Sequence, residues 1–306
     1  MDAAKRIEGV ASRTPLVESP ALSKRFGKEV FLKLECFQPI RVFKIRGAYN
    51  KLSQSHYDRV VAASSGNHGM AVAYSARLLG KRCKVVVPET AVKEKVSVIS
   101  EYGAEVVKFG RTSAEREAKA RQLANEDGGE FVHPYDDPDV VAGQGTCGLE
   151  VVEQLGDFDS VLVPVGGGGL ISGTAIAVKS RRPSVQVFGV EPTGAAKLAV
   201  SLKERHRVMV ESRSVADGLI PSSIGEIAFD VCSRLVSDVL TVSEEQITEA
   251  TRILLRDAHY LAEPSGAAPV AALLAGSGRE RLGKRVALII SGGNISLELL
   301  NRISAR

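Results

Sequence analysis

The chain has 306 residues and a formal net charge of +4, with 44% hydrophobic and 25% charged residues. This length is enough for a large core and for two lobes, and the composition is that of a soluble globular protein. Positive charges are interspersed with negative ones, as in 115–127, so the sequence predicts no basic groove for nucleic acid.

Membrane and extracellular classes are also excluded. No apolar stretch approaches the roughly 18 residues of a membrane span, and the N-terminus lacks the apolar core of a secretion signal. The cysteines are far apart and form no C-x-x-C pair, which argues against a zinc site or a disulfide framework. We expect a reduced, cytoplasmic protein in which these thiols are small buried apolar groups: Cys36, Cys83, Cys147 and Cys232.

Short β-branched runs alternate with amphipathic segments from about residue 59 onward. Helical spacing is clearest over 70–80 and 244–258. This alternation predicts α/β units on largely parallel sheets, with ligands beyond the carboxyl ends of the strands. The expected strands are 59–64, 81–88, 104–109, 160–165, 185–190 and 284–291.

Four consecutive glycines, 166–169, separate one such strand from a helical segment. Bare backbone at the start of a helix exposes amides that suit a phosphate. A tight strand-to-helix turn would need fewer glycines. A dinucleotide fingerprint would need a sixth-position glycine, where the chain has Ile171 or Ser172, although Glu191 could hold a ribose. A single small phosphate fits the loop best.

Upstream, Lys44 lies between Phe43 and Ile45. Apolar neighbours make a lysine easier to desolvate, which lowers its pKa and frees the amine to form an imine. Catalysis by pyridoxal phosphate (PLP) needs three features that this sequence offers: a reactive lysine, a loop for one phosphate and polar loops at other strand ends.

At these motifs the chain resembles the fold-type II PLP enzymes, within them the serine/threonine dehydratase and serine racemase branch. The resemblance covers nearly the whole chain, in order: FKIRGAYNKL, SSGNHGMAVAYSARLLG, VVAGQGTCGLEVVEQL, VPVGGGGLISG, GVEP, ADG, EPSGAA and SGGNIS. It implies a two-lobed α/β fold like that of tryptophan synthase β, with mostly parallel sheets flanked by helices. Residues 1–55 and 138–306 would form a large cofactor-binding domain, and 56–137 a small domain carrying the substrate loop.

The resemblance also implies residue roles. Lys44 would hold pyridoxal 5'-phosphate covalently and remove the α-proton of the substrate, and Ser291 would bond the pyridine nitrogen. Asn67 would bond the phenolic oxygen of the cofactor, while Phe43 and Gly218 would lie near the two ring faces. The phosphate would be bound by Gly166, Gly167, Gly168, Gly169 and Leu170, and the substrate carboxylate by Ser64, Ser65, Gly66, Asn67 and His68.

The implied reaction is β-elimination of water from L-threonine or L-serine, which gives a 2-oxo acid and ammonia, in a homo-oligomer (dimer or tetramer). Racemisation stays open, because Ser65 occupies the position of the second acid/base that a racemase needs and dehydratases share that serine. A nicotinamide dehydrogenase would leave Lys44 and Ser291 without a role. A non-catalytic binding protein would not need the full set of chemical groups.

The chain departs from the family pattern before the lysine, where T-G-S is replaced by Ile40, Arg41 and Val42. Arg41 could contact an acidic or bulky substrate side chain, so a dehydratase of the hydroxyaspartate or hydroxyectoine type is an alternative. Tyr135 replaces an asparagine that relatives often carry near the cofactor. No segment follows residue 306, so we expect no regulatory module.

A last departure concerns metal. Metal-activated members of the branch show E-P-x-x-A-x-D, whose glutamate, alanine carbonyl and aspartate bind a divalent cation. Here Glu191 and Ala195 are in place but Lys197 stands at the aspartate position. We expect no metal. Either Lys197 turns toward Glu191 and substitutes for the cation, or it points into solvent and the site is empty.

Overall fold

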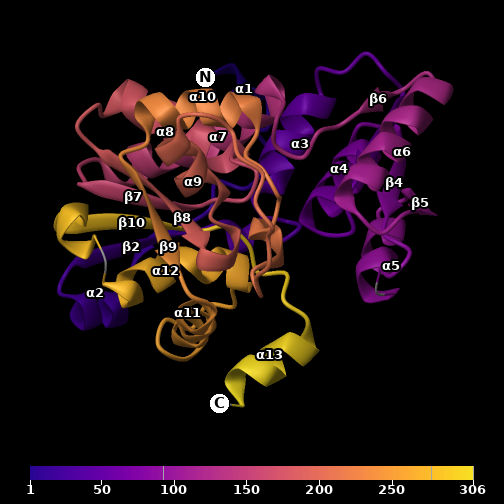
Figure 1. Ribbon diagram of the computed structural model, residues 1–306. Helices are drawn as coiled ribbons and strands as arrows, with labels where there is room; N and C mark the ends of the chain where they lie inside the picture. Colours follow the sequence, from indigo (N-terminus) through magenta and orange to yellow (C-terminus); the bar gives the residue numbers. More distant parts are fainter. Residues whose placement is uncertain (92, 277, 306) are drawn as a thin grey trace. The chain divides into compact units, whose positions relative to one another are not determined.

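The computed structural model describes residues 1–91, 93–276 and 278–305, with backbone alone for 93–95 (Figure 1). Its residues form two units: unit 1 comprises 1–11 and 44–143, and unit 2 comprises 12–43 and the described part of 144–306. These limits differ from the 55/56 and 137/138 limits expected from the sequence. The cofactor-binding and substrate-binding roles assigned to the two domains stay predictions.

Unit 2 is built on a six-stranded sheet of order β1-β2-β10-β7-β8-β9. All neighbouring strands are parallel except β1, which is antiparallel to β2. The strands are β1 Leu16–Glu18, β2 Glu29–Leu34, β7 Ser160–Pro164, β8 Gln186–Pro192, β9 Asp238–Val242 and β10 Arg285–Ile290. Its helices are α2 Pro20–Phe26, α8 Gly169–Arg181, α9 Lys197–Glu204, α10 Glu226–Leu235, α11 Glu244–Arg256, α12 Pro264–Ala275 and α13 Leu297–Ser304, with short 3-10 turns at Glu35–Phe37, Thr193–Ala195, Asp217–Leu219 and Arg279–Leu282.

Helices cover both faces of this sheet, because successive side chains of a strand point to opposite faces. On β10, Leu288 and Ile290 enter a core shared with α2, α11 and α12. Ala287 and Ile289 enter the opposite core, shared with α8 and α10. Figure 1 shows α11 and α12 on one side of the sheet and α8 and α10 on the other. A strand buried on both faces is a continuous apolar run, which is how "VALII" appears in the sequence.

Unit 1 contains a parallel four-stranded sheet of order β5-β4-β3-β6. Its strands are β3 Arg59–Ala63, β4 Arg82–Val87, β5 Glu105–Lys108 and β6 Glu130–Phe131. Its helices are α1 Asp2–Arg6, α3 Lys44–Leu52, α4 Asn67–Leu78, α5 Lys93–Glu101 and α6 Ser113–Glu126. Helix α7, Pro138–Leu155, begins in unit 1 and continues into unit 2.

The α/β class and the six expected strands are confirmed, as β3, β4, β5, β7, β8 and β10. The sequence did not predict β1, β2, β6 and β9. Two of these, β1 and β6, are edge strands of only three and two residues. The cysteines are buried and outside disulfides, as expected. No described helix is long and apolar enough to cross a membrane.

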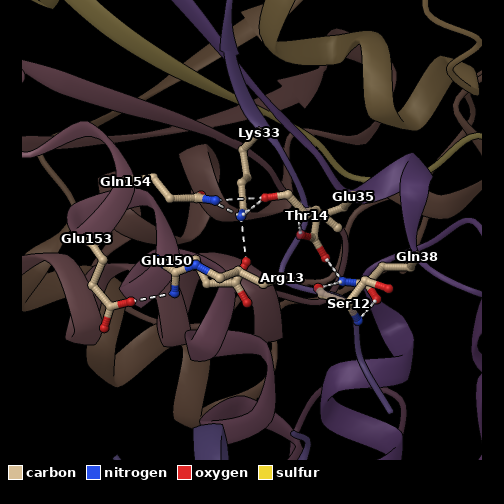
Figure 2. A network of polar contacts seen from close by, with 9 residues as sticks. All are labelled: Ser12, Arg13, Thr14, Lys33, Glu35, Gln38, Glu150, Glu153 and Gln154. Atoms are coloured by element: carbon tan, nitrogen blue, oxygen red, sulfur yellow. Dashed lines mark hydrogen bonds and ion pairs between the residues drawn. The ribbon is translucent and has the colours of Figure 1, made fainter. Parts of the chain in front are cut away.

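A buried polar network explains why β2 is not a purely apolar run. Lys33 of β2 has no exposed surface and donates to the Thr14 carbonyl, to Gln154 and to the Glu150 carboxylate (Figure 2). Thr14 in turn donates to Glu35 through its hydroxyl, at 2.5 Å. A buried charge is tolerated only when it is paired and hydrogen-bonded, as here. The network fixes the segment before β1 to β2 and α7.

Candidate active site

The glycine loop lies between β7 and α8 in unit 2. Helix α8 begins at Gly169, and its N-cap, Gly168, offers no side chain that could accept from the first amides. Within the described chain, the backbone amides of 166–171 donate to no protein acceptor. A helix N-terminus with such amides favours an anion through both its hydrogen bonds and its dipole. The predicted phosphate-binding loop is therefore a ready set of donors.

Two of these glycines have no room for a side chain. A Cβ at Gly166 would lie 2.6 Å from the carbonyl oxygen of Gly218. A Cβ at Gly168 would lie 2.4 Å from the Cβ of Ala228, and its φ of +99° is one that residues with side chains rarely adopt. Bare backbone is thus required at these two positions by close approach. The contact also places Gly218 beside the glycine loop.

Ser291 follows β10 at the carboxyl edge of the same sheet and is 3% exposed. Its carbonyl accepts from the amide of Phe43 at 3.0 Å, and Val42 forms an isolated antiparallel bridge with Gly292. Unit 2 therefore contains the predicted cofactor-binding residues Phe43, Gly218 and Ser291 together with the glycine loop, 166–170.

Lys44 begins helix α3 in unit 1. Its Nζ donates to the carbonyl oxygen of Pro134 at 2.7 Å. Burial lowers the pKa of the amine from 10.5 to about 8. The neutral form, which is the nucleophile and the base, is therefore far more populated near neutral pH than in an ordinary lysine. This is the behaviour that the apolar neighbours of Lys44 predicted.

The predicted substrate loop, 64–68, joins β3 to α4 in the same unit. The hydroxyl of Ser64 accepts from the amide of Gly66 at 3.2 Å, and α4 begins at Asn67 without a side-chain cap. His68 is buried, and its Nε2 lies 2.9 Å from the carbonyl oxygen of Val132. Burial, helped by the nearby Lys44 amine, lowers the pKa of His68 to about 3, so the imidazole is neutral and holds the loop in place.

The structure also shows the surroundings of Arg41 and Tyr135, two of the residues that depart from the family pattern. Arg41 has φ +58°, in the left-handed region, so this residue is held in a strained backbone conformation. Its carbonyl accepts from Gly293 at 2.9 Å. Tyr135 stacks edge-on against His133, with ring centroids 4.7 Å apart.

The structure decides between the two expectations for Lys197. Its side chain has no exposed surface and its Nζ lies 2.9 Å from Glu191 Oε1, so the solvent-facing alternative is wrong. Nζ also donates to the carbonyls of Val165, Ala195 and Leu219, at 2.9, 2.9 and 3.1 Å. Burial lowers the pKa of this ammonium and the Glu191 carboxylate opposes the change. No group of three or more metal-ligating side chains occurs among the described residues.

Two further groups support the predicted residues, and sequence reasoning missed the first of them. Ser265 accepts from the amide of Gly218 through its hydroxyl at 3.0 Å. His133 accepts at Nδ1 from the amides of Tyr135 and Asp136, which shapes the turn that presents the Pro134 carbonyl to Lys44. The motif EPSGAA contains Ser265, and that was the available signal.

Each group of residues fits part of pyridoxal phosphate. The unpaired amides of the glycine loop match the phosphate, the Ser291 hydroxyl matches a neutral ring nitrogen, and the depressed pKa of Lys44 matches an amine that reacts with an aldehyde. The glycine loop and Ser291 lie in unit 2, and Lys44 lies in unit 1.

Comparison with known proteins agrees with this chemistry. The family model described as "Pyridoxal-phosphate dependent enzyme" matches residues 7–292. L-threonine ammonia-lyase of Thermotoga maritima is 41% identical over 99% of this chain and 76% of its own length, and L-threo-3-hydroxyaspartate ammonia-lyase of Saccharomyces cerevisiae is 37% identical over 97% and 93%. The structure of maize serine racemase has a TM-score of 0.94 and 34% identity over 99% of this chain and 95% of its own. The chain belongs to the pyridoxal-phosphate-dependent enzyme family, with the fold-type II architecture.

Proposed function

We propose that this protein is an ammonia-lyase that eliminates water from L-threonine and L-serine and yields the 2-oxo acid and ammonia. The observation that carries the reaction class is Ser291, a neutral hydroxyl at the end of β10, in the unit that holds the phosphate-binding loop. A hydroxyl does not keep the pyridine nitrogen protonated as a carboxylate would, so bound PLP is a moderate electron sink that favours prompt loss of a β-substituent. The 41% identity to a threonine ammonia-lyase over nearly the whole chain supports the substrate class.

Lys44 is the proposed catalytic base. With a pKa of about 8, its Nζ is partly neutral at physiological pH and can take the α-proton of the substrate. The Pro134 carbonyl, 2.7 Å from Nζ, accepts a hydrogen bond from this amine and restricts its position. Proton removal needs both a populated neutral amine and a defined direction of attack.

The loop 64–68 is the proposed site for the substrate carboxylate. Its amides lead into α4, a twelve-residue helix without a side-chain cap, and the dipole of such a helix favours an anion at its N-terminus. Neutral His68 holds the loop to Val132 without adding a titrating charge. Binding of the carboxylate here would fix the substrate while Lys44 acts on its α-carbon.

Arg41 favours one second candidate, the elimination of water from a hydroxy amino acid with an acidic side chain. No carboxylate of the described chain pairs with its guanidinium, and its backbone is held in a strained conformation three residues before Lys44. Strain of this kind persists where the surrounding structure fixes it, often at ligand sites. The relative that acts on L-threo-3-hydroxyaspartate supports this alternative.

One assay separates these activities. The PLP-loaded enzyme is given L-threonine, L-serine or L-threo-3-hydroxyaspartate, and 2-oxo acid, ammonia and D-amino acid are followed together. We expect 2-oxobutyrate and pyruvate to form faster than any D-amino acid. Lys44→Ala should abolish the formation of both 2-oxo acids. Faster D-serine formation would establish a racemase, with Ser65 as the second acid/base. A strong preference for hydroxyaspartate that Arg41→Ala removes would establish the second candidate.

A cytoplasmic location and a homo-oligomeric state, dimer or tetramer, are part of the same proposal. Sedimentation of the purified enzyme tests the second, and a monomer at micromolar concentration would refute it.

A further inference from the structure

Lys197 is a fully buried cation of unit 2, and its contacts converge from four separate segments. They are the residue after β7 (Val165), the end of β8 (Glu191), the turn Thr193–Ala195 and the turn Asp217–Leu219. Three backbone carbonyls and one carboxylate form the kind of oxygen cage that holds a hard metal cation. Here the cation is an ammonium attached to the chain.

Charge balance within the cage is complete. Glu191 carries the compensating negative charge, and its oxygens also accept from the amides of Leu198 and Ala199 at the start of α9, at 2.9 to 3.1 Å. A buried ion pair of this geometry is satisfied as long as both partners are present, and removal of one leaves the other uncompensated. The metal that the E-P-x-x-A-x-D pattern would bind therefore does not fit this chain.

Two of the four contacts adjoin the phosphate-binding loop. Val165 directly precedes Gly166, and Leu219 directly follows Gly218. Gly166 and Gly218 are the two residues whose backbones approach so closely that a Cβ on one would strike the carbonyl of the other at 2.6 Å. Nζ of Lys197 thus ties together the two segments on either side of that close approach.

We propose that Lys197 is a positioning residue for the phosphate-binding loop. Its ammonium holds the Val165 and Leu219 carbonyls together at all times, whereas a divalent cation would do so only when bound. The inference rests on the phosphate-binding role proposed for 166–170. It implies that the loop is ordered without added metal. It also implies that the loop depends on the positive charge inside the cage and not only on the volume that the lysine side chain fills. Both consequences can be measured.

The main experiment is cofactor binding to the apoenzyme, measured by equilibrium dialysis. Lys197→Ala should weaken PLP binding by about 10- to 100-fold, the range typical when a group that orients ligand contacts is removed. n-Propylammonium, which replaces the lost carbons and the charge, should restore binding, and the uncharged isostere n-propanol should not. Lys203→Ala is the control, because Lys203 is exposed on the same helix.

The outcomes distinguish this inference from the role of the loop itself. Unchanged PLP affinity in Lys197→Ala, or equal rescue by propanol and propylammonium, overturns the positioning role of the ammonium. Unchanged affinity in Gly168→Ala would instead refute the phosphate-binding role. If Lys197→Ala does not fold, the double change Glu191→Gln with Lys197→Met removes both charges and keeps both volumes. Wild-type PLP affinity in that variant also overturns the proposal, and weakened affinity supports it.

Metal completes the test. Chelator treatment of the wild-type holoenzyme should leave PLP affinity and melting temperature unchanged, whereas a loss restored by magnesium or calcium would overturn the proposal. Lys197→Asp should be destabilised and should regain stability with calcium or magnesium, because it supplies an anionic ligand to a cage that has lost its cation. Absence of any metal effect on this variant would count against the cage as a cation site.

Discussion

At the scale of single residues, the amine of Lys44 sets a pH dependence. Burial lowers its pKa to about 8, and the neutral fraction rises with pH. Since only the neutral amine reacts with an aldehyde, reconstitution of the apoenzyme with PLP should speed up about tenfold per pH unit below 8 and level off above it. Stopped-flow absorbance between pH 7 and 10 measures the profile. A rate that still climbs beyond pH 9 would mean that Lys44 titrates like an exposed lysine.

A substitution at Gly168 gives a second prediction at the scale of single residues. Gly168→Ala adds a methyl group that meets Ala228 at 2.4 Å, at a φ of +99°. The strained backbone and the overpacking together should lower the free energy of unfolding by roughly 2–5 kcal/mol and weaken PLP binding.

Gly156→Ala is the matched control for this change. Gly156 also has a left-handed φ, of +72°, but nothing lies within 4 Å of its Cβ position. It should lose only about 1 kcal/mol, with no effect on PLP binding. Equal losses in the two variants, measured by urea denaturation, would show that packing around the loop is not the cause.

At the scale of elements, helix α3 holds the segment 130–139 at two points. Lys44 and Lys51 are seven residues apart, two helical turns, so they lie on one face. Lys44 binds the Pro134 carbonyl, while Lys51 lies 3.0 Å from Glu130 and 3.1 Å from Asp137. The two lysines thus fix the turn whose carbonyl accepts a hydrogen bond from Lys44.

Lys51→Met should therefore loosen this turn. The substitution leaves several carboxylates facing one another without a cation, in a partly buried position, and should cost about 2 kcal/mol of unfolding free energy. The carboxylates raise the pKa of Lys51 above its usual 10.5, so this contribution is fully present below about pH 10 and is lost only at more alkaline pH.

Two further variants show whether the charge is responsible. Lys51→Arg keeps the charge and should retain most of the stability. Lys84→Met removes a lysine of the same unit that pairs with Asp127 at 2.8 Å in a more exposed position, and should cost less than Lys51→Met. Denaturation curves at pH 7 and 10.5 compare the three. An equal cost for Lys51→Met and Lys84→Met would refute a special role for α3.

At the scale of the whole molecule, the two units share helix α7, and the chain crosses between them after residues 11, 43 and 143. The third crossing falls inside α7, so melting of either unit would unravel a helix of the other. We expect one calorimetric transition, and PLP should raise its melting temperature because a ligand that binds only the native state stabilises that state. At a PLP concentration a hundred times Kd, the gain in free energy of unfolding is about 2.7 kcal/mol. Two separate transitions would show that the units unfold independently.

The sequence by itself determined the class of fold and predicted the chemistry of the site. Runs such as "SVLVP" and "RVALII" specify buried parallel strands, because strands covered on both faces must be apolar throughout. The run of glycines at 166–169 and the apolar neighbours of Lys44 indicated a phosphate loop and a reactive amine, because both signals are local. The short edge strands β1 and β6 gave no such signal.

Only the tertiary structure decided how distant residues support these local features. The Pro134 carbonyl at Lys44, the Ser265 hydroxyl at Gly218 and the cage around Lys197 each join segments that are far apart in the sequence. The spacing of residues cannot determine whether a lysine such as Lys197 is exposed or buried, since that depends on which carbonyls the fold brings around it. Burial and oxygen contacts set the position and the charge of such an amine, and both are properties of the folded chain.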